Sequence, residues 1–285
     1  MDLVILGHGY SAAALSERAV ARGWRVFGTT RRDPARVTGA GAVALDWDRD
    51  QPEIARLIRE ADAILSSVPT SRGQDPVLAR HSDDLRKSRA FWIGYLSSTN
   101  VYGDHRGGWV DETTPAAPST TRAKARLAAE AGWRELAADE GLPLHIFRLA
   151  GIYGPGRGPF EKLRNGTARR LIKPDQIFSR IHRDDIGGAI WASVQRPSPG
   201  AIYNLCDDQP APPEDVIAHA AALLGMTPPP SEPFETAEMT DMARSFYADS
   251  KRVSNRALRD KLGYQLEYPD YDSGLRAILA AEAKG

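Results

Sequence analysis

The sequence predicts an α/β protein in which a doubly wound parallel sheet carries helices on both faces. Short apolar runs alternate with helical patterns along the first half of the 285-residue chain. Such alternation is typical of parallel sheets that are buried on both faces. A glycine-rich turn also joins the first apolar run directly to the first helical pattern. Because parallel strands need crossover connections of one hand, only right-handed βαβ units have to be considered.

Each element is predicted from the length and spacing of its apolar residues. A short apolar run bounded by turn residues indicates a buried strand, and a longer amphipathic stretch indicates a helix. In chain order the sequence predicts a strand at 3–6, a helix at 11–22, strands at 25–29 and 42–45, a helix at 52–60, a strand at 63–68, a helix at 76–87, a strand at 91–97, a helix at 121–139 and a strand at 144–149.

The turn after the first strand has the form of a dinucleotide-binding fingerprint. In this pattern Gly7 permits a tight turn, and Gly9 lets the backbone approach a pyrophosphate that faces the helix N-terminus. The third position is alanine, which still allows close packing of helix on strand. A purely structural turn is the alternative. The residues predicted to bind the cofactor here are Gly7, His8, Gly9, Tyr10, Ser11 and Ala12.

The end of the second predicted strand indicates which dinucleotide binds. NAD-binding folds usually place an acidic residue here for the ribose hydroxyls, but no acidic residue lies between the end of this strand and Asp33. Arg31 and Arg32 stand there instead, and a guanidinium suits the ribose phosphate of NADP. We therefore expect NADP rather than NAD, with a solvated surface pair of arginines as the alternative.

The residue pattern of the chain changes after Leu149. Segments rich in glycine and proline at 151–159, 197–200 and 228–233 indicate turns or linkers, while 184–195 returns to a helical pattern and 201–205 to a strand pattern. The predicted organisation is a nucleotide-binding Rossmann domain and a smaller, mostly C-terminal substrate-binding lobe. The domain is formed by 1–150 and about 177–204, and the lobe by about 151–176 and 205–285.

Composition excludes several classes of protein. Lys plus Arg and Asp plus Glu both number 37, so the net charge is zero, which argues against a broad surface for nucleic acid or another polyanion, though not against a local basic pocket. Cys206 is the only cysteine, so no intrachain disulfide can form and a reducing cytoplasm fits. The sequence lacks a signal-like N-terminus and an apolar run approaching the roughly 20 residues of a membrane span. No second His or Cys lies at ligand spacing from His182, so no metal is expected.

Several segments resemble the extended branch of the short-chain dehydrogenase/reductase family. Residues 97–103 are similar to its Ser-Ser-x-x-Val-Tyr-Gly strand end, residues 148–156 to its Arg-x-x-x-x-Tyr-Gly-Pro-Gly segment, and residues 181–185 to its Ile-His-x-x-Asp segment. Lys124 lies in a setting similar to the family's Tyr-x-x-x-Lys helix. The resemblance runs from Gly7 to about Tyr264 and is strongest to atypical nucleoside-diphosphate-sugar epimerases and dehydratases.

The resemblance implies roles for individual catalytic residues. Ser98 would hydrogen-bond the substrate oxygen, and Lys124 would bind the nicotinamide ribose. The family's catalytic tyrosine lies four residues before the lysine, where this chain has Thr120. An aliphatic hydroxyl is a poor general acid, but it could hold a water or a substrate oxygen.

The resemblance also implies further cofactor contacts. Asp46 would lie near the adenine amine, Trp47 would be a stacking neighbour or a packed edge, and Ser67 and Val68 would line the cofactor cleft. We expect an oxidoreductase or sugar-nucleotide-modifying enzyme with an altered acid/base. Its partners would be a small molecule, such as a nucleotide-sugar, and a second copy in a homodimer. The alternatives are a non-catalytic nucleotide sensor and a purely structural scaffold.

Overall fold

The centre of the molecule is a parallel sheet with the strand order β3-β2-β1-β4-β5-β7-β11. The computed structural model describes residues 1–283, with the side chain of Met242 excepted. The strand order reverses between β1 and β4, which is the switch point of a doubly wound sheet, so the predicted Rossmann fold class is confirmed. The strands are β1 (Asp2–Leu6), β2 (Arg25–Thr30), β3 (Val43–Asp46), β4 (Ala63–Ser66), β5 (Trp92–Ser98), β7 (Leu144–Leu149) and β11 (Ile202–Leu205).

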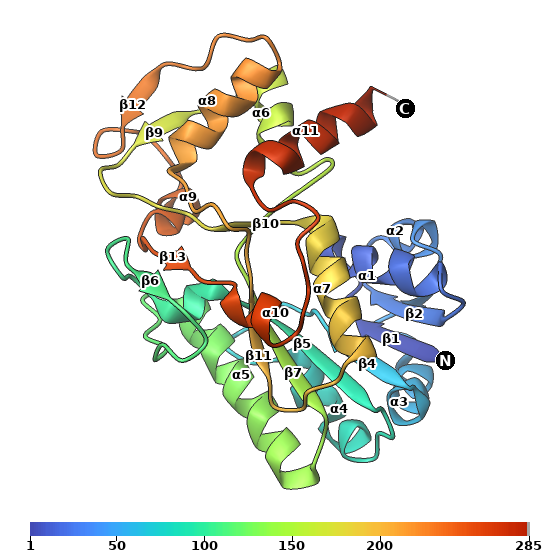
Figure 1. Ribbon diagram of the computed structural model, residues 1–285. Coiled ribbons are helices and arrows are strands. Elements are labelled where there is room, and N and C mark those ends of the chain that lie inside the picture. The colour runs from blue at the N-terminus through green and yellow to red at the C-terminus, as the bar shows by residue number, and fades with distance from the viewer. Residues whose placement is uncertain (284–285) are drawn as a thin grey trace.

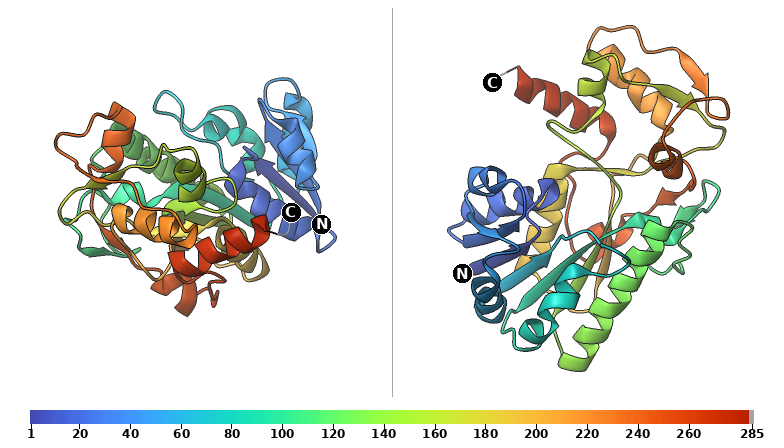
Figure 2. Two further views of the ribbon diagram at one scale, coloured as in Figure 1. Left: turned by 90° about the horizontal axis from the view of Figure 1, so that it is seen from above. Right: turned by 180° about the vertical axis from the view of Figure 1, so that it is seen from behind.

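Helices cover both faces of this sheet (Figures 1 and 2). One face carries α1 (Tyr10–Val20), α2 (Pro34–Gly39), α7 (Arg183–Gln195) and α10 (Arg256–Asp260), and the other carries α3 (Gln51–Glu60), α4 (Pro76–Arg86) and α5 (Thr121–Glu140). Side chains of a strand alternate between faces, so Leu3 and Ile5 enter the first core while Val4 and Leu6 enter the second. This two-sided burial explains why β1 is apolar at consecutive positions.

A smaller lobe stands beyond the carboxyl ends of the strands, at the top of Figure 1. It has its own core cluster, in which Phe160, Ala220, Leu275 and Ile278 are buried. Its elements are α6 (Pro159–Arg164), β9 (Arg170–Ile172), α8 (Pro213–Leu223), β12 (Ser231–Pro233), α9 (Asp241–Phe246) and α11 (Tyr271–Glu282). The division into two domains at about 150, 177 and 204 stays a prediction.

Short parallel pairs connect the lobe to the sheet domain. Strand β8 (Gly151–Tyr153) pairs with β10 (Arg180–His182), and β6 (Trp109–Val110) pairs with β13 (Arg252–Val253). The segment that leaves the sheet after β7 therefore meets the segment that returns to it through α7. These paired strands bring residues from distant parts of the sequence to one edge of the sheet.

Candidate functional site

The glycine turn lies between β1 and α1 at the carboxyl edge of the sheet. Gly7 has φ 83°, and a Cβ there would lie 2.9 Å from both the Cγ2 and the backbone N of Val68. The turn therefore requires glycine both for its backbone conformation and for space. The Gly7 N–H donates to Thr29 Oγ1 at 2.8 Å, which fixes the turn to β2.

The N-terminus of α1 fits a pyrophosphate. Gly9 is the N-cap, no side chain caps the helix, and the first turn holds no acidic residue. A Cβ at Gly9 would meet no atom within 4 Å among the described residues. The first intrahelical bond runs from Ala13 N–H to Gly9 O, so the preceding N–H groups, those of Tyr10, Ser11 and Ala12, can donate to phosphate oxygens.

His8 supports the turn from beneath. Its imidazole packs so tightly against β2 that a Cβ at Gly28 would lie 2.7 Å from His8 Cδ2. Both ring nitrogens lack a hydrogen-bond partner among residues 1–283, and burial lowers the pKa of His8. The backbone N–H of His8 donates to Thr29 O at 2.8 Å, so it too is bound within the fold.

Arg31 and Arg32 follow the end of β2 with exposed side chains. Arg31 Nε lies 3.2 Å from Asp48 Oδ2, and its guanidinium carbon lies 6.0 Å from the centre of the Trp47 ring. These contacts hold Arg31 near the edge of the strand, where an adenosine ribose would lie.

Asp33, the acidic residue that directly follows these two arginines, has a structural role. Asp33 is the N-cap of α2, where Oδ1 accepts from Arg36 N–H at 3.0 Å and Oδ2 lies 3.2 Å from Arg36 Nη2. Acceptor positions on both oxygens of this carboxylate are therefore used within α2.

Other residues that were predicted to bind the cofactor lie along the same edge. The Asp46 carboxylate accepts from the N–H groups of Asp48 and Arg49, at 2.8 and 3.1 Å. Trp47 is buried in the second core, so it is a packed edge residue. Ser67 is half-buried after β4, and Val68 lies under Gly7.

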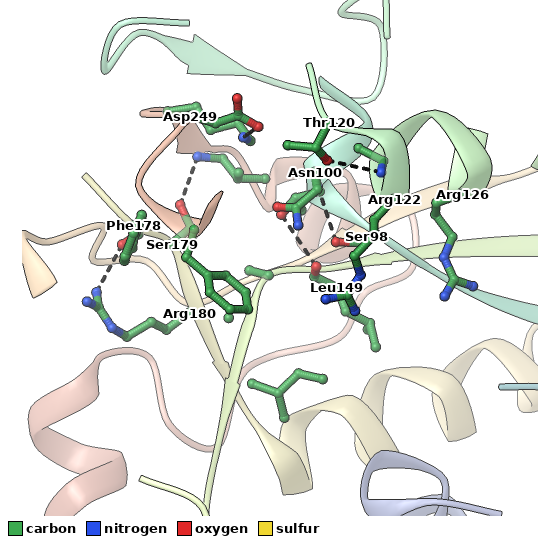
Figure 3. Close-up of a pocket in the computed structure, with 18 of the residues that line it drawn as sticks. Ser98, Asn100, Thr120, Arg122, Arg126, Leu149, Phe178, Ser179, Arg180 and Asp249 are labelled. Carbon is green, nitrogen blue, oxygen red and sulfur yellow. Dashed lines mark hydrogen bonds and ion pairs between the residues drawn. The ribbon is translucent and has the colours of Figure 1, made fainter. Parts of the chain in front are cut away.

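A cavity of about 590 Å³ lies between the sheet edge and the smaller lobe (Figure 3). Its lining comes from segments far apart in sequence, which the short parallel strand pairs help to bring together. They are 69–70 after β4, 98–100 after β5, the first turns of α5, 149–153 between β7 and β8, Arg157, 177–180, 245–246 and residues 249, 251 and 253. A concave site at the carboxyl ends of the strands is where ligands bind in open α/β sheets.

Ser98 and Thr120 both line this cavity. Ser98 Oγ accepts from Asn100 N–H at 3.2 Å, at the start of a short 3-10 helix, η1 (Thr99–Tyr102). Thr120 is the N-cap of α5, and its Oγ1 accepts from Ala123 N–H at 3.2 Å. Each hydroxyl therefore keeps its own proton for donation to a ligand or a water.

The structure does not bring Lys124 to the cavity with Ser98 and Thr120. Lys124 is exposed, whereas Arg122 and Arg126 line the cavity from successive turns of α5 (Figure 3). Residues four apart share a helix face, but residues two apart differ by about 200° around the axis. The Arg122-x-x-x-Arg126 pair has the spacing of the family's Tyr-x-x-x-Lys pair, and sequence reasoning missed it.

The hydroxyl groups of the tyrosines near the cavity are hydrogen-bonded to other residues. Tyr153 lines it, but its hydroxyl donates to Asp270 O at 3.2 Å and burial raises its pKa. The buried Tyr102 hydroxyl donates to Asn204 Oδ1 at 2.8 Å, and its pKa is also raised by burial. Burial raises the pKa of Tyr10 to about 12, and its hydroxyl donates to Pro155 O at 2.9 Å. None of these three tyrosines therefore has a phenol whose pKa is lowered.

Fold and site together define a Rossmann protein whose glycine turn fits a dinucleotide and whose adjoining cavity fits a small molecule. The chain belongs to the NAD dependent epimerase/dehydratase family, whose model matches residues 83–206. It is accordingly an NAD(P)-binding, oxidoreductase-like protein, and the predicted family is confirmed.

Three comparisons describe its similarity to individual proteins. Protein YeeZ of Escherichia coli K12 is 31% identical over 288 residues, which cover 94% of this chain and 96% of YeeZ. A solved conserved protein of unknown function from Silicibacter pomeroyi is 48% identical, with a TM-score of 0.92 over 98% of both chains. The UDP-glucuronic acid 4-epimerase of Bacillus cereus, solved with UDP-glucuronic acid and NAD, shares the fold at 14% identity and a TM-score of 0.79, over 100% of this chain and 99% of that one.

Within residues 1–283 no group of three or more His, Cys, Asp or Glu side chains is arranged to hold a metal ion. In the same part of the chain, no helix combines the length and the apolar character needed to span a bilayer.

Proposed function

We propose that this protein is an NADP(H)-dependent oxidoreductase acting on a small molecule of the nucleotide-sugar class, which binds in the cavity beside Ser98. The single observation that carries this proposal is the placement of the Ser98 and Thr120 hydroxyls in one cavity at the sheet edge that also holds the open N-terminus of α1. When bound, the cofactor supplies or accepts the hydride. Ser98 donates a hydrogen bond to the reacting oxygen, and Thr120 holds a water that exchanges the proton. Lys124 as a ribose ligand and the homodimer stay predictions.

The preference for NADP rests on charge at the end of β2. Arg31 and Arg32 are exposed there, and the carboxylate of Asp33 is held by Arg36. A ribose phosphate gains charge-assisted hydrogen bonds from a guanidinium, whereas free ribose hydroxyls lose the carboxylate acceptor that NAD requires.

Replacing Arg31 with glutamate is expected to reverse the cofactor preference. In fluorescence titrations the wild type should bind NADPH at least about 10-fold more tightly than NADH, because one charge-assisted contact contributes about 1.5–3 kcal/mol. Arg31→Glu should lose that preference by repelling the phosphate. Arg134→Glu, on an exposed position of α5, makes the same charge change far from β2 and should keep it. Equal affinity of the wild type for both cofactors would contradict the NADP assignment, and binding of neither would contradict the function.

A non-catalytic NADP sensor is the second candidate, favoured by the absence of an acidic tyrosine among the described cavity residues. Ser98→Ala separates the two candidates. If the protein is an enzyme, cofactor oxidation with a panel of nucleotide-sugars and carbonyl compounds should fall by about 100-fold or more, because the oxygen loses its donor. NADPH affinity should not change. A wild type that binds NADPH but turns over no member of the panel would favour the sensor.

A further inference from the structure

The charges in the cavity wall are strongly unbalanced. Five cationic side chains line it, whereas Asp249 is the only carboxylate among the described lining residues. Asp249 is itself occupied, because its Oδ1 accepts from Ser119 Oγ at 2.6 Å and its Oδ2 lies 3.5 Å from Lys251 Nζ. Asp249 therefore offsets Lys251, and the described lining holds no other carboxylate for the remaining cations, although the buried Asp207 outside the lining attracts Arg180. Those cations are Arg122, Arg126, Arg157 and Arg180.

Two of these arginines have contacts that explain their position. Arg180 donates to the carbonyl oxygens of Phe178 and Ala211, at 3.0 and 3.1 Å, on the opposite wall from α5 (Figure 3). Arg157 packs over the ring of Tyr10 with its guanidinium carbon 5.6 Å from the centre. Arg122 and Arg126 differ from both in standing four residues apart on α5, so their guanidinium groups line the cavity from successive turns of one helix.

The Arg126 guanidinium is held in place by neutral partners, so its positive charge is not neutralised. Its Nη1 donates to Tyr95 Oη at 2.8 Å and to Leu96 O at 3.1 Å, and its guanidinium carbon lies 5.6 Å from the centre of the Tyr95 ring. None of these partners carries a negative charge, and Nε and Nη2 make no hydrogen bond within residues 1–283. Arg122, one turn earlier, makes no hydrogen bond or ion pair in the same part of the chain.

We propose that Arg122 and Arg126 form an oxyanion-recognition site, and that the substrate carries a carboxylate or phosphate at the end that enters beside Ser98. This inference about the substrate rests on the proposed function. Guanidinium groups bind both oxyanions through paired N–H donors, and the N-terminal end of α5, which has no acidic residue in its first turn, adds partial positive charge. A guanidinium does not release its proton, so the pair selects and orients an anion and does not replace the missing acid.

The test measures the binding of simple oxyanions to protein that is saturated with NADP⁺, so that the cofactor's own phosphate sites are filled. Inorganic phosphate and malonate are titrated at constant ionic strength by calorimetry, which distinguishes a phosphate site from a carboxylate site. At least one should bind the wild type. Arg122→Gln should weaken it about 10-fold or more, because a charge-assisted contact is lost. Since Arg122 is exposed and unbonded, the variant should fold normally.

Two further variants make the result decisive. Arg126→Lys keeps the positive charge but loses the planar guanidinium with its paired N–H donors, so it should also weaken anion binding. The matched control Arg134→Gln, on the same helix but outside the cavity, should bind as the wild type does. Binding of neither anion to the wild type, or equal binding to Arg122→Gln, overturns the proposal. The same titrations on cofactor-free protein report on the arginines even if NADP⁺ fails to bind, so this failure is distinguishable from failure of the proposed function.

Discussion

Replacing Arg148 with alanine is expected to lower the free energy of unfolding by about 3–5 kcal/mol. Arg148 on β7 and Glu130 on α5 form a buried bidentate ion pair, with Nε–Oε1 and Nη2–Oε2 distances of 3.1 and 2.7 Å. Arg148 Nη1 also donates to the buried hydroxyl of Tyr102 at 3.0 Å. Only 4% of Arg148 and 1% of Glu130 is exposed, so removal of the guanidinium leaves a carboxylate in the core with no counter-charge.

Chemical denaturation of matched variants measures this effect. Arg86→Ala removes an exposed arginine whose Nε lies 3.0 Å from Glu140 Oε1, and it should cost no more than about 1 kcal/mol. The double variant Arg148→Met with Glu130→Leu should recover much of the loss, because no unpaired charge remains. A cost below about 1 kcal/mol for Arg148→Ala would show that the ion pair does not hold α5 on the sheet.

Replacing Gly9 with alanine is expected to weaken NADPH binding by roughly 100-fold, about 2.7 kcal/mol, while the protein stays folded. A Cβ at Gly9 meets nothing within 4 Å, and φ is −103°, which any residue adopts. The space that the methyl group would fill is where the backbone has to approach a pyrophosphate. The stability cost should stay within about 1 kcal/mol, as for a substitution at an N-cap.

The neighbouring glycine supplies the contrast. Gly7→Ala places a Cβ at a positive φ and 2.9 Å from Val68, so its cost of about 1–3 kcal/mol should appear in stability as well as in binding. Thermal unfolding and NADPH titration on both variants separate the two effects. Unchanged NADPH affinity in a folded Gly9→Ala protein would place the cofactor somewhere other than across the N-terminus of α1.

The strands and helices of the sheet were predictable because their signals are local. Leu3 to Leu6 are consecutively apolar because β1 is buried on both faces, and the chain then turns at Gly7. The short helix α2 was not predicted, since it has one buried residue, Val37, and depends on a cap from Asp33. The small elements of the lobe gave equally weak patterns, because each packs only a few apolar residues.

The face of α5 that lines the cavity was less predictable. The spacing of Thr120 and Lys124 suggested a pair on one face, but Thr120 is the N-cap and Lys124 is exposed. The buried positions of the helix include Ala123, Glu130 and Trp133, and they indicate which side meets the sheet. That stripe, read with the period of 3.6 residues, could have pointed to Arg122 and Arg126 beside it.

The sequence by itself determined the Rossmann fold, the family and the glycine turn, because strand–helix alternation and a turn of fixed residue types are encoded in contiguous segments. Only the tertiary structure decided which side chains share the cavity. Arg180 and Lys251 come from segments that meet through the parallel pairing of β8 with β10 and of β6 with β13, and Arg126 comes from α5 beside β5. Contacts of this kind depend on the rotation of each helix about its axis and on the path of the chain between the sheet domain and the smaller lobe. No pattern in a contiguous stretch of sequence indicates either the helix rotation or the chain path.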